Sequence, residues 1–158
     1  MESKWFSEDE FRCKCCGQLP SEGIDQNLVN MLDDIRETAG QPLNLNCGYR
    51  CASHNTEVGG VPNSQHNANP CTAADIDATD IGVEVLAKLA EQAGADGIGK
   101  YSNFLHADVS NLIQKAAAKP ATVVYYTSTQ QEADKQAQAL AKTDKADYIL
   151  KQTTPQIL

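Results

Sequence analysis

Two histidines and one aspartate, each in its own short segment, constrain this chain more than any other feature. His66 ends the segment SQH, Asp75 lies in AADI, and His106 lies in FLHAD. A catalytic zinc takes three protein ligands from histidine and carboxylate and leaves a fourth position open. We therefore predict that His66, Asp75 and His106 bind one zinc ion, although they come from separate segments of the chain.

Other short motifs lie between and around these three segments. They are NCGYR at residues 46–50, HN at 54–55, GG at 59–60 and GIGKY at 97–101. Together, in this order, the motifs resemble those of the zinc D-Ala-D-Ala carboxypeptidases. The relatives of that family include phage endolysins and cell-wall endopeptidases, and its metal site is shared with the hedgehog signalling domain. The resemblance covers residue 6 to about residue 110, and independent motifs in the correct order rarely coincide.

The resemblance implies both a fold and an activity. The fold would be α+β, of the hedgehog and DD-peptidase type, with a small antiparallel sheet that carries the zinc site and helices packed on the other face. The activity would be that of a zinc-dependent carboxypeptidase or endopeptidase, a hydrolase whose substrate is a peptidoglycan stem peptide. The resemblance does not determine which bond is cleaved. The candidates are a D-Ala-D-Ala end, a D-centred crosslink and an L-Ala-D-Glu bond.

The chain departs from the family pattern at two places. Relatives usually have a glycine three residues after the first zinc histidine, whereas the segment 67–72 is two residues longer here and contains no glycine. The small-small-Asp-aliphatic pattern around Asp75 is kept, so we expect the ligands to be unchanged. Cys47 is the second departure, because relatives usually have serine there.

Three residues are assigned to substrate binding. The planar guanidinium of Arg50 suits a carboxylate or a carbonyl and could stabilise a developing oxyanion, so the resemblance implies a catalytic role as well. A surface ion pair is the alternative for Arg50. We also expect Tyr49 and Ser64 to contact substrate, although the Ser64 hydroxyl could equally cap its loop.

The general base has two candidates. Many relatives have a carboxylate three residues before the last zinc histidine, but Asn103 stands there and cannot accept a proton. Asp108 shares a strand face with His106, so it could accept the proton from water or orient His106. Asp77 bears the same relation to Asp75 and is the alternative base.

The length of the chain indicates one domain, and its charge limits the kinds of partner that it can bind. The chain has 158 residues, the length of one domain, and a net charge of −8. Phosphate binding needs clustered lysine and arginine, so we expect no nucleic-acid partner. No apolar run reaches the length of a membrane span, and the first residues lack the apolar region of a signal peptide. We expect a monomer that acts on the cell wall as a phage or prophage lytic protein or particle component, and otherwise a cytoplasmic protein.

Six cysteines leave two roles open. A disulfide framework and a structural zinc both fit their number and spacing, and the resemblance includes an FxCxxCG-like segment near the N-terminus. We expect a structural role with the bond type undecided. The cysteines are Cys13, Cys15, Cys16, Cys47, Cys51 and Cys71.

Sequence periodicity predicts the secondary structure. A capping box at residues 7–10 begins a short helix. The expected helices are at 25–39 and 82–93, and the expected strands at 43–47 and 73–78, with a hairpin at 97–100 and 104–109. Residues 52–72 are expected to form a long irregular segment. We divide the chain into a zinc peptidase domain at 1–110 and a C-terminal extension at 111–158, with a strand-helix-strand unit at 123–126, 130–142 and 148–150.

Two other functions stay open. Cys47 or Cys71 with a histidine would make a cysteine peptidase, although neither shows the helix N-terminus or adjacent cation that activates a thiol. A zinc site that has lost its activity would instead make a cell-wall-binding module. The absence of a carboxylate at position 103 favours that second alternative.

Overall fold

The computed structural model describes residues 1–110, 123–127, 148–152 and 158. Its centre is a six-stranded sheet with the strand order β1-β2-β4-β3-β5-β6. Neighbours among the first four strands are antiparallel, whereas β5 pairs parallel with β3 and β6 pairs parallel with β5. The strands are β1 (Leu45–Cys47), β2 (Ala73–Asp77), β3 (Gly97–Lys100), β4 (Phe104–Asp108), β5 (Val123–Thr127) and β6 (Tyr148–Gln152).

The longest helix begins and ends where its capping residues predict. Asp25 accepts a hydrogen bond from the Asn27 amide at the start of α1 (Gln26–Ala39), and Gly40 ends that helix with a φ of 67°. The other helices are α2 (Ala52–Glu57) and α3 (Val83–Gln92), with 3-10 turns η1 (Glu8–Phe11) and η2 (Gln65–Asn67). The helices predicted at 25–39 and 82–93 are confirmed. Within the described residues, no helix combines the length and apolar character needed to cross a membrane.

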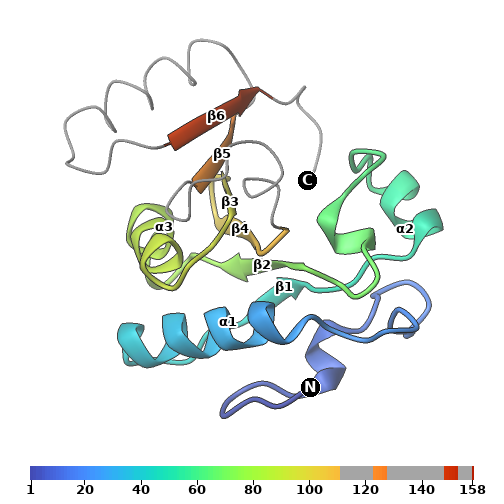
Figure 1. Cartoon of the computed structure of the whole chain (residues 1–158), viewed down its shortest axis with the longest axis horizontal. Helices are drawn as coiled ribbons and strands as arrows, with labels where there is room; N and C mark the ends of the chain where they lie inside the picture. The colour runs from blue at the N-terminus through green and yellow to red at the C-terminus, as the bar shows by residue number, and fades with distance from the viewer. Residues whose placement is uncertain (111–122, 128–147, 153–157) are drawn as a thin grey trace.

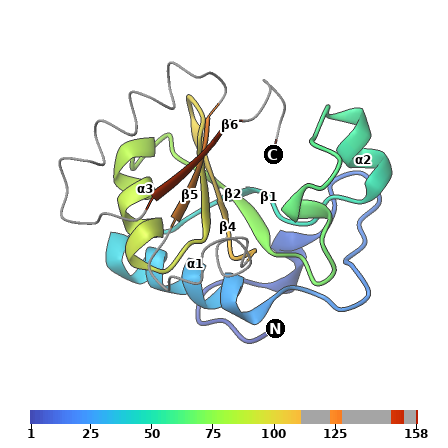
Figure 2. The same cartoon turned by 45° about the horizontal axis from the view of Figure 1, so that its top comes forward.

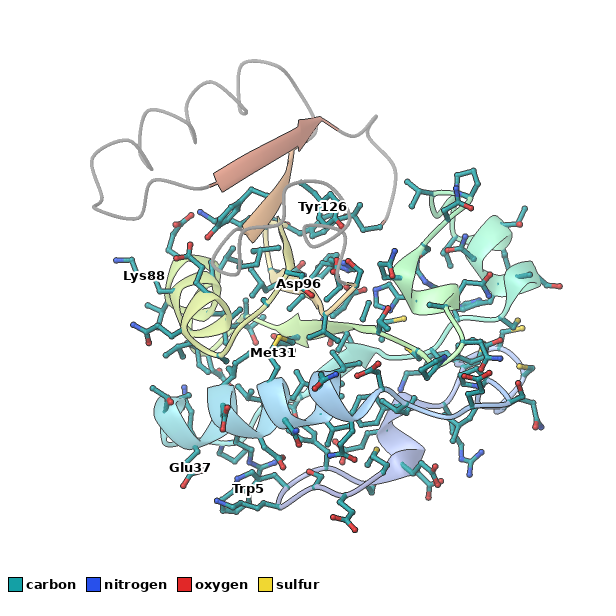
Figure 3. The ribbon with its side chains drawn as sticks, viewed as in Figure 1. Trp5, Met31, Glu37, Lys88, Asp96 and Tyr126 are labelled. Atoms are coloured by element: carbon teal, nitrogen blue, oxygen red, sulfur yellow. The ribbon has the colours of Figure 1, made fainter. Side chains whose placement is uncertain are left out.

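The long helices cover one face of the sheet. Figure 1 shows α1 alongside β1 and β2, with α3 beside β3 and β4, and both figures place α2 on the far side of the sheet from α3 (Figure 2). Met31 lies between α1 and the sheet, while Trp5 and Glu37 lie on the other side of α1 (Figure 3). The strands contribute Ile76, Leu105 and other alternate residues to this core. The opposite face is therefore free to carry polar residues.

The segment 52–72 is more ordered than its composition predicts. It contains α2 and η2, so the prediction of a wholly irregular segment is wrong. The lengthened segment 67–72 is tied to the residues before α1. The Cys71 amide donates to the Gly23 carbonyl at 3.0 Å, and the Cys71 carbonyl accepts from the Asp25 amide at 3.0 Å. The two extra residues are thus accommodated by this contact.

The predicted strands after residue 110 extend the same sheet. β5 and β6 confirm the strands expected at 123–126 and 148–150, whereas the helix expected at 130–142 lies outside the described residues. Their parallel pairing makes the sheet mixed, so only its first four strands form the expected antiparallel part. The division of the chain at residue 110 stays a prediction.

Candidate metal centre

One row of residues crosses the polar face of the sheet. Asp75 of β2 lies opposite His106 of β4, which lies opposite Gly99 of β3. Gly99 in turn pairs with Tyr126 of β5, and Cys47 of β1 pairs with Asp75 at the other end. Residues in such a row point to the same face, so β-pairing brings together side chains that are far apart in the sequence.

The three predicted zinc ligands converge on one point. His66 Nε2 lies 3.1 Å from Asp75 Oδ1 and 3.1 Å from His106 Nδ1, and the last two atoms are 3.2 Å apart. All three side chains are buried. Ligand atoms about 2.0–2.1 Å from a tetrahedral zinc would lie roughly 3.3 Å from one another. The triangle therefore has nearly the size that a zinc ion requires.

The outer atoms of the two histidines determine what the inner atoms can do. His66 Nδ1 lies 2.6 Å from the Gly48 carbonyl, which can only accept, so Nδ1 carries the proton. His106 Nε2 lies 3.2 Å from Asp108 Oδ2, and this nitrogen therefore donates to the carboxylate. In the neutral rings, the inner nitrogens then have bare lone pairs that face the Asp75 carboxylate. The two inner nitrogens and the Asp75 carboxylate thus direct three lone pairs at one point, an arrangement that attracts a cation. Two histidine nitrogens and a carboxylate oxygen are a donor set that suits zinc.

The pKa values of the same three groups are shifted by burial and by their mutual contacts. Burial opposes ionisation of Asp75, but His66 and His106 outweigh it and lower the Asp75 pKa. Burial lowers the pKa of His106, yet hydrogen bonds to Asp108 and Asp75 raise it overall to about 9. The pKa of His66 is lowered, chiefly by burial. Without a metal, the cluster would therefore bind a proton at His106.

Asp108 is saturated by neighbours on the far side of the His106 ring. Its Oδ2 accepts from His106 Nε2 and from the Tyr126 hydroxyl at 3.1 Å, and its Oδ1 accepts from the Ser110 amide at 3.1 Å and hydroxyl at 2.6 Å. The side chain is fully buried. Of the two roles predicted for Asp108, this geometry favours the orientation of His106.

The alternative base lies elsewhere. Asp77 Oδ1 accepts from the Thr79 amide at 2.8 Å and hydroxyl at 2.7 Å, and these bonds lower its pKa. Asn103 is exposed in the turn between β3 and β4, where its carbonyl accepts from the Ala78 amide. The identity of the general base stays a prediction.

Tyr126 belongs to the site although the sequence analysis did not assign it there. Its ring meets His106 edge-on with centroids 5.8 Å apart, and its hydroxyl donates to Asp108. A Cβ at Gly97 would lie 2.3 Å from Asp108 Oδ2 and 2.7 Å from Tyr126 Cε2, so glycine is required there. The GIG motif of β3 thus leaves room for the residues that support His106. The run Val123-Val124-Tyr125-Tyr126 predicted a strand, but it did not identify the partner strand.

Arg50 lies next to the ligand turn and is buried. Its Nη2 donates to Ser64 Oγ at 3.1 Å, and the same hydroxyl accepts from the His66 amide at 3.2 Å. The Arg50 amide donates to the His66 carbonyl at 2.9 Å. Arg50 is only 2% exposed, which contradicts the alternative of a surface ion pair. Ser64 thus caps the turn that carries His66 and holds Arg50, while its contact with substrate stays a prediction.

The Arg50 guanidinium has spare hydrogen-bonding capacity. Its Nε is buried without a hydrogen-bond partner. Among the residues that the structure describes, no carboxylate forms an ion pair with it. A buried cation without a partner is costly, so this arrangement favours an anionic group of a ligand.

The segment before Arg50 packs closely on the N-terminal turn. A Cβ at Gly48 would lie 2.6 Å from Phe11 Cα, so only glycine permits this approach. The Tyr49 amide donates to the Phe11 carbonyl at 2.7 Å. The Tyr49 side chain is partly buried against the core, and its predicted contact with substrate stays a prediction.

The structure separates two cysteines from the other four. Cys71 is a fully buried core residue, whereas Cys47 Sγ lies within 4.8 Å of the ligand atoms of His66 and Asp75. Burial raises the pKa of each thiol to about 12, and Asp75 adds to the effect. Neither thiol is therefore activated as a nucleophile.

The remaining four cysteines lie together near the start of α2. They are Cys13, Cys15, Cys16 and Cys51, and all six cysteines of the chain are free thiols in the structure. Burial raises the pKa of Cys13, but backbone N–H groups of Cys51, Cys16 and Cys15 outweigh it and lower the pKa to about 6.

A protein-family model covers the part of the chain that contains this site. The model of the family described as Peptidase M15 matches residues 4–108. This range includes the three convergent ligands, Arg50 and Asp108, and it ends before β5. No curated protein matches the chain.

Proposed function

The chain belongs to the peptidase M15 family, and we propose on that premise that it is a zinc-dependent peptidase that cleaves peptidoglycan stem peptides. The observation that carries the metal is the triangle of lone pairs from His66, Asp75 and His106, with sides of 3.1–3.2 Å. A zinc ion held there would supply Lewis-acid chemistry, polarising a peptide carbonyl and making water acidic enough to act as a nucleophile.

The protein's own residues hold this site rigid. Gly48 fixes the tautomer of His66 through its carbonyl, and Asp108 fixes that of His106. Both imidazoles are thereby held with the inner nitrogen unprotonated and aimed at Asp75. Such outer partners orient ligands and raise their basicity, so they support both metal affinity and turnover.

Arg50 gives the clearest indication of the substrate. Its buried guanidinium already binds Ser64 and retains an unpartnered Nε. We infer that it binds a carboxylate of the stem peptide or the oxyanion formed during hydrolysis. A charge-assisted bond of this kind suits D-amino-acid stem peptides, which carry free carboxylates.

A zinc-containing cell-wall-binding module is the second candidate. Its support is that Asp108 is saturated by hydrogen bonds and that Asp77 is held by Thr79, so neither predicted base is free. A cysteine peptidase is disfavoured, since burial raises the pKa of both Cys47 and Cys71 to about 12.

The test is hydrolysis of defined stem peptides by metal-free and zinc-loaded protein. The panel contains a pentapeptide ending in D-Ala-D-Ala, its C-terminal amide, a crosslinked dimer and an L-Ala-D-Glu peptide. We expect chelation to abolish cleavage, zinc to restore it, and thiol alkylation of the zinc-loaded protein to leave it intact. His66→Ala should be inactive, and Asn103→Ala, in the exposed turn between β3 and β4, should serve as the active control.

Arg50→Lys tests substrate recognition within the same assay. It should retain zinc but lower kcat/KM about 10- to 100-fold, the value of one charge-assisted hydrogen bond. Arg36→Lys, on the side of α1 that packs against Trp5, is the matched control. Tight zinc binding with no cleavage of any peptide, but retention on peptidoglycan, would support the binding module instead.

A further inference from the structure

Four thiols form a second cluster outside the site described above. The Sγ atoms of Cys13, Cys15 and Cys51 lie within 4.8 Å of one another. The Cys16 thiol interacts with the thiols of Cys13 and Cys51. Three of these cysteines come from the loop after η1, and the fourth immediately precedes α2. The fold thus joins two distant segments at this cluster.

The backbone around the cluster directs N–H groups at the sulfurs. The Cys51 amide donates to Cys13 Sγ at 3.4 Å, and the His54 amide donates to Cys51 Sγ at 3.4 Å. The chain turns sharply after the Cys13-x-x-Cys16 spacing, where the Gly17 amide binds the Cys13 carbonyl at 2.8 Å and Gly17 has a φ of 70°. Donors aimed at sulfur stabilise thiolates, which are the form that binds metals.

We propose that Cys13, Cys15, Cys16 and Cys51 bind a second zinc ion, with a structural role. Four thiolates are a donor set that zinc accepts in closed tetrahedral sites. With Zn–S bonds of about 2.3 Å, the sulfurs of such a site would be roughly 3.8 Å apart. The sulfurs of Cys13, Cys15 and Cys51 lie within 4.8 Å of one another, so they need to approach by at most about an ångström. Cys15 and Cys16 are exposed, so the ion can enter from solvent.

A disulfide explains this cluster less well. One bond would use two of the sulfurs and leave two thiols beside it. A four-thiolate metal site uses all of them and also explains the amide donors at Cys13 and Cys51.

His54 is the alternative fourth ligand in place of Cys16. Its Nδ1 is buried, has no hydrogen-bond partner among the described residues, and lies 3.5 Å from Glu57 Oε2. Its ring also groups with Cys15 and Glu57 within 4.8 Å. The Cys16 thiol is preferred because it interacts with two of the other three thiols, whereas the His54 ring groups with only one of them.

The second zinc would hold the segment that carries Arg50. Cys51 directly follows Arg50, and Phe11, two residues before Cys13, binds the Tyr49 amide. The ion would therefore hold two neighbours of the Gly48-Tyr49-Arg50 segment in place: Cys51, which follows it, and the loop after Phe11, which binds it. This consequence for substrate binding rests on the proposed function, whereas the metal site itself does not.

The first experiment is metal analysis of protein purified under reducing conditions. We expect two zinc ions in the unaltered chain, one in His66→Ala, one in Cys51→Ser and none in the double variant. Cys71→Ala removes a thiol outside the cluster and should retain two. One zinc in the unaltered reduced chain that persists in Cys51→Ser, or two zinc ions in Cys51→Ser, would overturn the proposal. If only the His66-dependent ion is missing, the proposed peptidase site fails while the thiolate site stands.

Cobalt substitution identifies the ligands without relying on activity or on the folding of Cys51→Ser. Cobalt bound to His66→Ala should show strong thiolate-to-metal charge-transfer absorption. Cys16→Ser should lower the absorption per cobalt by about a quarter, and His54→Ala should leave it unchanged, because absorption scales with the number of thiolates. Absorption left unchanged by Cys16→Ser, together with weaker cobalt binding in His54→Ala, would overturn the assignment of Cys16 in favour of His54. Absence of thiolate absorption, together with a disulfide in the mass spectrum of the reduced protein, would overturn the site as a whole.

Discussion

The Asp108 carboxylate and His106 Nε2 lie 3.2 Å apart, and this contact decides which ring nitrogen faces Asp75. The carboxylate fixes the proton on Nε2, so Nδ1 is left with a lone pair for the metal. Asp108 was one of two candidates for the general base, and its four hydrogen bonds favour a positioning role. The two roles make different predictions.

Asp108→Asn should weaken zinc binding. An amide lacks the negative charge that raises the basicity of His106, and loss of such an outer partner typically costs about 10- to 100-fold in metal affinity or activity. The measurements are zinc affinity by competition with a chelator, and turnover at saturating zinc. Asp77→Asn is the matched control for zinc affinity, which it should leave unchanged, because the Asp77 carboxylate binds Thr79 and no proposed ligand. Unchanged affinity with turnover lowered by more than about 100-fold would identify Asp108 as the base instead.

Tyr126→Phe tests whether the segment after residue 110 contributes to the metal site. Removal of the hydroxyl deletes one hydrogen bond to the buried Asp108 carboxylate, so zinc affinity should fall by about 10-fold. Tyr125→Phe removes a hydroxyl from the neighbouring residue, which binds Glu91 away from the metal, and should leave zinc affinity unchanged. Equal affinities in the two variants would show that Tyr126 is dispensable for the site.

Local sequence patterns predicted most of what surrounds the metal. The alternation in residues 73–78 and 104–109 correctly placed Asp75 and His106 away from the core, and helical spacing with Asp25 and Gly40 predicted α1. These features depend on neighbours in the chain, so a periodic pattern is enough to reveal them.

The features that were missed depend on contacts between distant segments. The parallel pairing of β5 with β3 brings Tyr126 to His106, and no local pattern specifies a partner strand. α2 has only six residues and is capped by the Cys51 sulfur, a weaker signal than the usual oxygen caps. The cysteine cluster likewise exists only because two loops meet, which is why its spacing left disulfide and metal both open.

Cys47→Ser should retain zinc at the first site. Cys47 Sγ lies near the ligand atoms of His66 and Asp75, but the chain already offers three better-placed ligands with mutual distances of 3.1–3.2 Å. Cobalt bound to this site, in a Cys51→Ser background that removes the thiolate cluster, should therefore lack strong charge-transfer absorption. If the charge-transfer absorption is present in Cys51→Ser and lost in Cys47→Ser/Cys51→Ser, Cys47 is a fourth ligand. The open position that catalysis needs would then be closed.

Gly97→Ala should disturb the metal site without altering any group that binds the metal. The added methyl would lie 2.3 Å from Asp108 Oδ2 and 2.7 Å from Tyr126 Cε2, so at least one of these buried side chains must move. We expect a loss of about 1–3 kcal/mol in the free energy of unfolding, as for other overpacked cores, together with weaker zinc binding. Chemical denaturation with and without zinc gives the first quantity, and chelator competition gives the second. Asn103→Ala, in the exposed turn of the same hairpin, should change neither. If Gly97→Ala kept the zinc affinity of the unaltered protein, the packing of Asp108 against β3 would not be what holds His106 in place.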